Sequence, residues 1–469
     1  MTWLRISQTM DSPLYFLRPY RMNSCGLSNI QQLIECGHLN VNSIFFLDQY
    51  KQMSILQFAI LNSYDDLIDY LLKNHVDLNA STDFFWTALH VAIEEKKLDV
   101  VQKLVFFGAD INILPNHRAA QPPLHQAIQS GTYDITEFLV KSGADVNFIP
   151  YKVDLSSLGW CSWSPLNLAI SLMNIPVIEL LLKHNAIIDQ GSSELRSSLQ
   201  LALLSHTNSI EIFQILEKFG AKFEIIKDGK YTLEFLTAVG RDNIEIFNLF
   251  VKKCDNFLDI SNRVGDTIAH EAVLLCSQNI LRYLLDCGIN VNVVNIEDNE
   301  SFLDVAKAMN ETYATYETDD FSIIVKMIKK HIIKLSAAGL YVNTKNSKAV
   351  NSRHFRSFRE KCVKEISELK IRKISDTNFN YFDVVVKNVH RLAVGLRHSD
   401  FCFIEDKILT EFQVYGSIMI EKLRRVVERK ELLKNAAELY NIFYMDLPYL
   451  FIRNIFNYLS NEDLKLLSQ

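Results

Sequence analysis

A repeated segment constrains the fold of this 469-residue chain more than any other feature. Similar six-residue motifs begin 33 to 36 residues apart, with a single interval of 42. The eight copies are SILQFA at 54–59, TALHVA at 87–92, PPLHQA at 122–127, SPLNLA at 164–169, SSLQLA at 197–202, YTLEFL at 231–236, TIAHEA at 267–272 and SFLDVA at 301–306. No copy of this length can bury its apolar face alone, so neighbouring copies are expected to stack into one elongated array.

Each copy is predicted to contain two helices. The motif itself forms a short first helix, which its opening Thr or Ser can cap. Apolar residues then recur at helical spacing and predict a second helix, as in Val100, Val101, Leu104 and Val105. Glycines such as Gly108, Gly143 and Gly288 suit the left-handed position that ends this helix. The interval of 42 residues indicates an insertion near 149–160, which we interpret as a recognition loop.

A second motif identifies the type of repeat. GADIN at 108–112 and GADVN at 143–147 follow the clearest copies by about twenty residues. The pair of T-P-L-H-x-A and G-A-D-x-N resembles the ankyrin repeat. The resemblance covers 27–310, with about eight repeats and an N-terminal half repeat at 29–42, after a cap segment at 1–26. It implies an all-α solenoid that recognises proteins.

The charge of the chain divides where the repeats end. Residues 321–469 carry 26 Lys and Arg against 16 Asp and Glu, whereas 1–320 carry 23 against 39. This asymmetry indicates two parts with different partners. The eight cysteines form no CxxC pair and predict reduced thiols, and no signal peptide or membrane span is expected.

The residues after the array read as a different, all-helical region at 311–440. FSIIVKMIKKHIIKL at 321–335 predicts a basic amphipathic helix. Four further helices are predicted, at about 354–374, 380–397, 402–426 and 428–441. The basic run at 422–430 is interpreted as a solvated helix face, with a nucleic-acid patch as the alternative.

The C-terminal segment, 441–469, contains LPYLFIRNIFNYLSNEDLKLLSQ. Its Leu-Pro start, apolar helical stripe and Asp-Leu restart resemble a truncated F-box. An ankyrin array with such a tail is similar to the PRANC arrangement of poxvirus host-range and immune-evasion proteins. That family recruits the Skp-family adaptor of the host cullin–RING (SCF) ubiquitin ligase. The resemblance implies that the adaptor-facing residues are Leu447, Pro448, Ile452, Ile455, Leu459, Asp463 and Leu464. The alternative is a terminal hairpin that packs on its own helical region.

Candidate contacts with a captured protein are fewer. The aromatic residues expected in the array's loops are Phe84, Phe85, Trp160 and Trp163. Trp163 adjoins a repeat motif, so local packing is the alternative. His90, His125 and His270 occupy one motif position and are expected to bond across the turns, not to bind metal.

No catalytic motif occurs, so no enzyme, cofactor or metal is expected. The function predicted from the resemblance is that of a viral substrate adaptor. Its repeats would bind a host protein, and its tail would recruit the Skp-family adaptor and cullin. The alternative is an inhibitor that sequesters its target without a ligase. Neither a nucleic-acid nor a membrane partner is expected. The expected location is the host cytoplasm, with the nucleus as the alternative.

Overall fold

The computed structural model describes most of the chain. The described residues are 15–16, 24–46, 52–81, 87–114, 121–149, 163–188, 197–204, 209–222, 224–252, 254, 257–313, 319–374, 377–396, 403–442, 459, 461 and 463. They belong to two compact units, Met1–Lys222 and Phe223–Gln469. Each unit is described by itself below.

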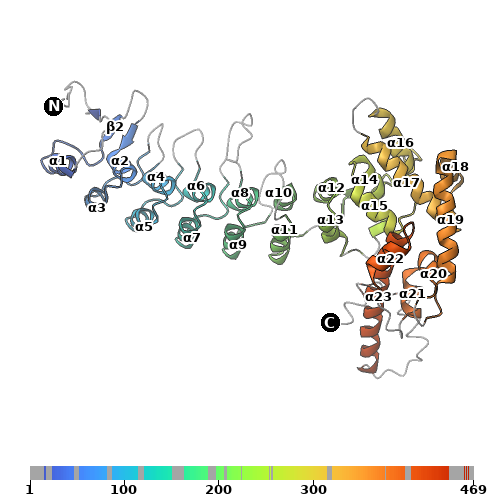
Figure 1. The fold of residues 1–469 in the computed structure, drawn as a ribbon. Helices are drawn as coiled ribbons and strands as arrows, with labels where there is room; N and C mark the ends of the chain where they lie inside the picture. The colour runs from blue at the N-terminus through green and yellow to red at the C-terminus, as the bar shows by residue number, and fades with distance from the viewer. Residues whose placement is uncertain are drawn as a thin grey trace. The chain divides into compact units, whose positions relative to one another are not determined.

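The first unit is a stack of antiparallel helix pairs (Figure 1). The helix α1, Ser24–Glu35, stands before them as the expected half repeat. The five pairs of the described residues are α2 (Ile55–Leu61) with α3 (Asp65–Lys73), α4 (Ala88–Glu94) with α5 (Leu98–Phe106), α6 (Pro123–Gln129) with α7 (Tyr133–Lys141), α8 (Pro165–Ser171) with α9 (Ile175–Lys183), and α10 (Ser198–Leu204) with α11 (Ser209–Lys218). Each first helix packs on the first helix of the next pair. The repeat motif thus sets the period of the stack.

Local chemistry explains where these helices begin and end. The Ser54 hydroxyl accepts from the Gln57 N–H at 3.2 Å, and the Gln57 amide oxygen accepts from the Ser54 N–H at 2.8 Å. This reciprocal pair satisfies two N–H groups at the start of α2. Gly108 and Gly143 follow α5 and α7 with φ of 95°, the left-handed conformation expected for them.

The core of the first unit consists of apolar side chains from successive pairs. Leu89 and Ala92 of α4 are buried together with Val100, Val101 and Leu104 of α5. The same positions are buried in the following pairs, so each helix pair shares its apolar surface with both neighbours.

Short strands accompany the first pair. β1 (Tyr15–Phe16) pairs in parallel with β2 (Ile44–Phe46), and β2 pairs antiparallel with β3 (Gln52–Ser54), with Phe45 opposite Met53. They add little to a fold that is otherwise helical.

The second unit begins with three more helix pairs. A tight hairpin, β4 (Ile226–Lys227) and β5 (Lys230–Tyr231), precedes them. The pairs are α12 (Leu233–Gly240) with α13 (Ile244–Val251), α14 (Ile268–Leu274) with α15 (Gln278–Cys287), and α16 (Phe302–Thr312) with α17 (Asp320–Ala337). A 3₁₀ turn, η2, spans Phe257–Asp259. The third pair therefore continues the repeat pattern past residue 310.

The remaining helices pack beside these pairs. They are α18 (Thr344–Ala349), η3 (Arg353–Phe355, a 3₁₀ turn), α19 (Arg356–Ile371), α20 (Tyr381–Val386), α21 (Val389–Gly395), α22 (Glu405–Glu411) and α23 (Gly416–Ile442). The helix α19 packs on α17, and α23 packs on α15, α20, α21 and α22 (Figure 1). The long helix α23 thereby joins the last repeats to the rest of this unit.

The boundaries in this region correct three predicted helices. The helix predicted at 380–397 is two helices, α20 and α21, separated at Lys387 and Asn388. The sequence predicted helices at 402–426 and 428–441, whereas α22 ends at Glu411 and α23 runs unbroken through 427. The Glu365 carboxylate of α19 accepts from the N–H groups of Val414 and Tyr415, at 3.0 and 2.8 Å, just before α23. A carboxylate there satisfies free N–H groups and complements the helix dipole. The break therefore depends on a residue some fifty positions away.

The all-α prediction is confirmed in the described residues, apart from the five short strands. No helix there is both long and apolar enough to cross a membrane.

Candidate functional site

Buried histidines link successive repeats, whereas the sequence predicted only that they bond across the turns. The Nδ1 atom of His90 lies 2.7 Å from the Thr87 hydroxyl, at the start of the same helix. Its Nε2 atom lies 2.8 Å from the carbonyl of Gln121, the residue before the N-cap of α6. The His90 ring thus joins the start of its own first helix to the start of the next.

The Nε2 contact recurs in two other pairs. His125 Nε2 lies 2.9 Å from the Trp163 carbonyl, and His270 Nε2 lies 3.3 Å from the Glu300 carbonyl. Both carbonyls directly precede an N-cap. The Nδ1 atom of His125 has no hydrogen-bond partner, because Pro122 supplies no hydroxyl at the N-cap.

Burial keeps these rings neutral. It lowers the pKa of both His90 and His125 to about 4, because desolvation outweighs the hydrogen bonds to Gln121 and Trp163. Burial also lowers the pKa of His270. A neutral ring can donate from Nε2 to a carbonyl, as each of these rings does. Among the described residues, no three His, Cys, Asp or Glu side chains are grouped as metal ligands.

One repeat uses a tyrosine for the same link, which the sequence did not reveal. In the copy at 231–236 the N-cap is Thr232, one residue later than the motif alignment suggested, and buried Phe235 stands at the histidine position. The Tyr231 hydroxyl lies 3.0 Å from the carbonyls of Ile260 and Asp266. Asp266 precedes the N-cap Thr267. A tyrosine from outside the helix therefore reaches the carbonyl that histidines reach elsewhere.

A second set of polar links runs through the loops that follow the second helices. In each, an asparagine side-chain oxygen accepts from a main-chain N–H of the next repeat, over 2.7–3.0 Å. We call these links the asparagine ladder. Its members are Asn42 to Asp77, Asn79 to Asp110, Asn112 to Asp145, Asn147 to Ile187, and Asn292 to Asn343. An Asn or Asp two residues earlier holds each ladder asparagine by accepting from its N–H, as Asp110 does for Asn112 at 2.9 Å.

The described ladder occupies two stretches, 40–187 and 290–343. The copy at 197–202, which begins between them, has Glu224 at the ladder position. The boundary of the two units, at Lys222 and Phe223, lies in this interval.

The predicted cargo contacts are only partly described. Trp163 is half-buried, and its carbonyl belongs to the His125 link, while Phe84, Phe85, Trp160 and the insertion near 149–160 lie outside the described residues. A different aromatic pair is exposed. Phe106 is 85% exposed at the end of α5 and lies edge-on to Phe107, with 5.6 Å between the ring centroids. The second helices of the other four pairs end in lysine, so Phe106 replaces a cation with an apolar contact surface.

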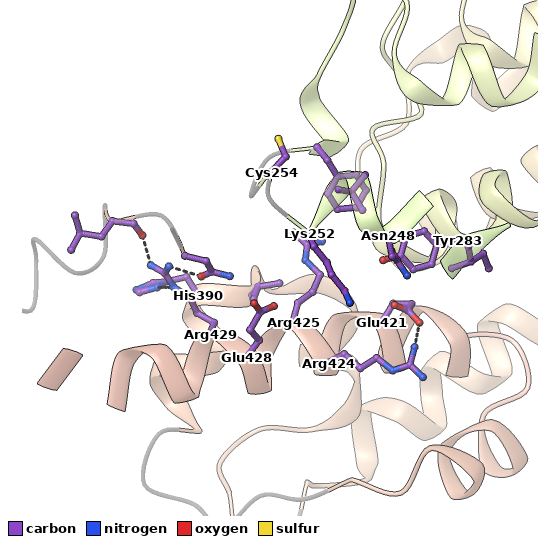
Figure 2. Close-up of a pocket in the computed structure, with 16 residues that line it drawn as sticks. Asn248, Lys252, Cys254, Tyr283, His390, Glu421, Arg424, Arg425, Glu428 and Arg429 are labelled. Atoms are coloured by element: carbon purple, nitrogen blue, oxygen red, sulfur yellow. Dashed lines mark hydrogen bonds and ion pairs between the residues drawn. The ribbon is translucent and has the colours of Figure 1, made fainter. Parts of the chain in front are cut away.

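A groove of about 880 Å³ lies in the second unit, between its first repeats and the helices α21 and α23 (Figure 2). Asn248 of α13, Lys252 at the C-cap of α13 and Tyr283 of α15 line one wall of the groove. Glu421, Arg424, Arg425, Glu428 and Arg429 lie along α23. The described tail residues Leu459 and Asn461 complete the lining.

The basic run at 422–430 is only partly the solvated face that the sequence predicted: Arg424 is exposed, whereas Lys422, Arg425 and Arg429 are partly or fully buried. Lys422 donates to the Val385 carbonyl at 2.9 Å, and burial lowers its pKa to about 8. Arg425 donates to the Cys287 carbonyl at 3.2 Å, while Arg424 pairs with Glu405 at 2.6 Å and with Glu421. These cations therefore hold α23 against its neighbours.

Arg429 makes the contact that reaches the tail. Its side chain is 7% exposed and donates to the Leu459 carbonyl at 2.5 Å and to the Asn461 amide oxygen at 2.7 Å (Figure 2). It also donates to Nδ1 of His390 at 3.4 Å. One guanidinium thus joins α23, α21 and two tail residues.

Leu459 packs against an apolar cluster of the second unit. This cluster is formed by Leu392, Ala393, Leu396, Val426, Leu432 and Leu433, with Phe379, Val389 and Val394 beside it. Of the predicted adaptor-facing residues, only Leu459 and Asp463 are described. Leu447, Pro448, Ile452, Ile455 and Leu464 lie outside the described residues.

Comparisons with known proteins agree with this geometry. The family model for ankyrin repeats matches three overlapping copies, at residues 22–115, 56–149 and 124–228. The array has the fold of an ankyrin-repeat solenoid over the matched residues. Its helix pairs from α12 onward lie beyond the matched range, although they keep the links between neighbouring pairs.

The chain is also similar to a viral protein. It is 26% identical over 343 residues to the ankyrin repeat protein FPV031 of fowlpox virus (strain NVSL), which covers 68% of this chain and 93% of the fowlpox protein. In a comparison of structures, the ankyrin repeat domain of Bcl-3, described as a unique member of the IkappaB protein family, covers 48% of this chain and 95% of that domain. The sequence identity is 23% and the TM-score 0.36. The ankyrin repeats indicate that this chain binds other proteins.

Proposed function

We propose that this chain is a viral substrate adaptor. Its ankyrin repeats bind a host protein, and its C-terminal tail recruits the Skp-family adaptor and cullin of the host SCF ligase. In this proposal the chain carries out no chemical step itself. It holds the target close to the ligase, and such tethering raises the local concentration of the target there.

The observation that carries the proposal is the division of the chain into two kinds of structure. A stack of repeats offers a long surface on which the aromatic pair Phe106 and Phe107 is exposed and available for contacts. A separate set of helices, α18–α23, follows the repeats and contacts the described tail residues. The similarity to a fowlpox ankyrin repeat protein supports a viral setting.

A ligase-independent inhibitor is the second candidate, and one contact favours it. Leu459, which the F-box resemblance assigns to the adaptor, packs against the chain's own helices. In that case the tail stabilises the second unit, and the repeats act by sequestering their target.

Recovery of the ligase with the purified chain tests the proposal. The full chain, a Leu447→Ala/Pro448→Ala variant and a chain ending at Asp446 are each incubated with purified Skp-family adaptor and cullin. We expect the full chain to retain both proteins and the two altered chains to lose them. The double variant keeps Leu459, which controls for loss of packing in the truncated chain. Equal retention by all three, or retention by none, would contradict recruitment through the tail and favour the inhibitor.

A further inference from the structure

The contact between Arg429 and the tail has a consequence for the accessibility of the tail. The Leu459 carbonyl and the Asn461 amide both accept from one guanidinium of α23, over 2.5 and 2.7 Å. Hydrogen bonds with a charged donor are stronger than neutral ones, and more so where water is excluded. At 7% exposure, Arg429 is such a donor. Its two bonds fix these tail residues on the surface of α23.

The side chain of Leu459 is held on the same surface as its carbonyl. It packs against the apolar cluster of α21 and α23, which includes Leu392 and Val426. A side chain packed in this way cannot simultaneously insert into a groove on another protein, because each mode buries the same apolar surface.

We propose that the surface formed by α21, α23 and Arg429 binds the chain's own residues Leu459 and Asn461, and that this docking competes with the ligase adaptor for the tail. Arg429 sets the balance between the two states. The inference rests on the proposed function, and it adds that Leu459 and Asn461 must leave α21 and α23 before the adaptor can bind. The apparent affinity for the adaptor is then reduced by the fraction of chains whose tail is docked.

Two measurements on the full chain test this competition. The first is hydrogen exchange of the amides around 459–463, and the second is the affinity for purified Skp-family adaptor. Arg429→Gln removes the charge and leaves a shorter polar side chain, which lacks the two terminal nitrogens that donate to Leu459 and Asn461. We expect faster exchange at 459–463 and adaptor binding tighter by on the order of ten-fold, because lost hydrogen bonds to a charged group shift a two-state equilibrium by about that factor.

Arg424→Gln is the matched control. Arg424 lies on the same helix and lines the same groove, but it pairs with Glu405 and Glu421 instead of the tail. We expect unchanged exchange at 459–463 and unchanged adaptor affinity. A second variant, Asn461→Ala, removes one acceptor and leaves Arg429 in place. We expect it to raise exchange and to tighten adaptor binding, as in Arg429→Gln, but by less. It also provides a test if Arg429→Gln impairs folding.

The outcomes separate this inference from the proposed function. If exchange rises in Arg429→Gln and Asn461→Ala while adaptor affinity stays constant or falls, docking does not compete and the inference is overturned. The same holds if neither variant raises exchange. If no variant binds the adaptor at all, the proposed function fails, and the competition fails with it. Faster exchange together with tighter binding supports both.

Discussion

The hydroxyl of Tyr231 donates a hydrogen bond to the main-chain carbonyl of Asp266 over 3.0 Å, and so performs in one repeat the role of a histidine in others. Tyr231 is 7% exposed and also stacks on Phe235, with ring centroids 5.5 Å apart. The repeat that departs most from the motif therefore keeps the link to its neighbour by another route.

Removal of this hydroxyl is expected to destabilise the second unit. Tyr231→Phe keeps the ring stacking but leaves the carbonyls of Ile260 and Asp266 without this donor, at a cost of about 1–3 kcal/mol. Urea unfolding followed by circular dichroism measures the effect. Tyr341→Phe is the control, because the Tyr341 side chain is 80% exposed. Equal midpoints for the two variants would show that the Tyr231 hydroxyl is not needed.

The buried histidines predict a loss of stability in mild acid. The pKa of His90 is about 4 in the folded chain and about 6.5 in the unfolded chain, so only the unfolded state gains a proton between these values. The contribution of neutral His90 to folding stability is fully present above pH 6.5. It is lost as the pH falls toward 4, which lowers the free energy of unfolding by up to about 3 kcal/mol.

The substitution His90→Gln tests this pH dependence with a residue that the chain itself uses, since Gln57 and Gln200 occupy the equivalent position. Unfolding free energies are measured in urea at pH 7.5, 6 and 4.5. We expect the unfolding free energy to fall less steeply with decreasing pH in the variant than in the unchanged chain. Identical slopes would exclude His90 as a source of acid sensitivity.

The asparagine ladder predicts a small and chemically selective effect. Asn112→Ala removes the acceptor for the Asp145 N–H, and because this N–H lies at the surface the expected cost is about 0.5–1 kcal/mol. Asn112→Asp keeps an oxygen at the same place and should cost less. The comparison uses urea midpoints of the full chain, and an alanine variant as stable as the aspartate variant would argue against the ladder bond.

Substitution of alanine for two glycines is expected to change stability in opposite directions. Gly288 follows α15 with φ of 88°, so Gly288→Ala strains the backbone and should destabilise the chain by about 1 kcal/mol, although no atom obstructs the new methyl group. Gly240 lies in α12 without positive φ, and its new methyl group would meet only Leu275 at 3.9 Å. Gly240→Ala should therefore stabilise the helix by up to about 1 kcal/mol. Thermal midpoints check both, and shifts of the same sign would contradict this backbone argument.

Features set by neighbouring residues were predictable from the sequence. The helix pairs, the left-handed Gly108 and Gly143, and the histidine links all follow from a motif that repeats at a fixed period. Their geometry is local to one repeat and its neighbour, so each copy carries the information it needs.

Features set by distant residues were not predictable. The break before α23 depends on Glu365, and the burial of Lys422 and Arg429 depends on carbonyls of Val385 and Leu459. Helical periodicity shows that a charge lies on one side of a helix. It does not show which main-chain oxygen will face that charge, so Lys422 and Arg429 were wrongly interpreted as part of a solvated face.

The asparagine ladder also bears on how such an array can change in length. Every bond joins an asparagine of one copy to a main-chain N–H of the next, so it requires almost nothing of the next side chain: Asn147 bonds to Ile187 as Asn112 does to Asp145. After a gene duplication or deletion of one whole copy, the asparagine of one copy would still face a main-chain N–H of the copy that follows it. The array can therefore gain or lose recognition surface in units of one repeat, without redesign of the copies on either side.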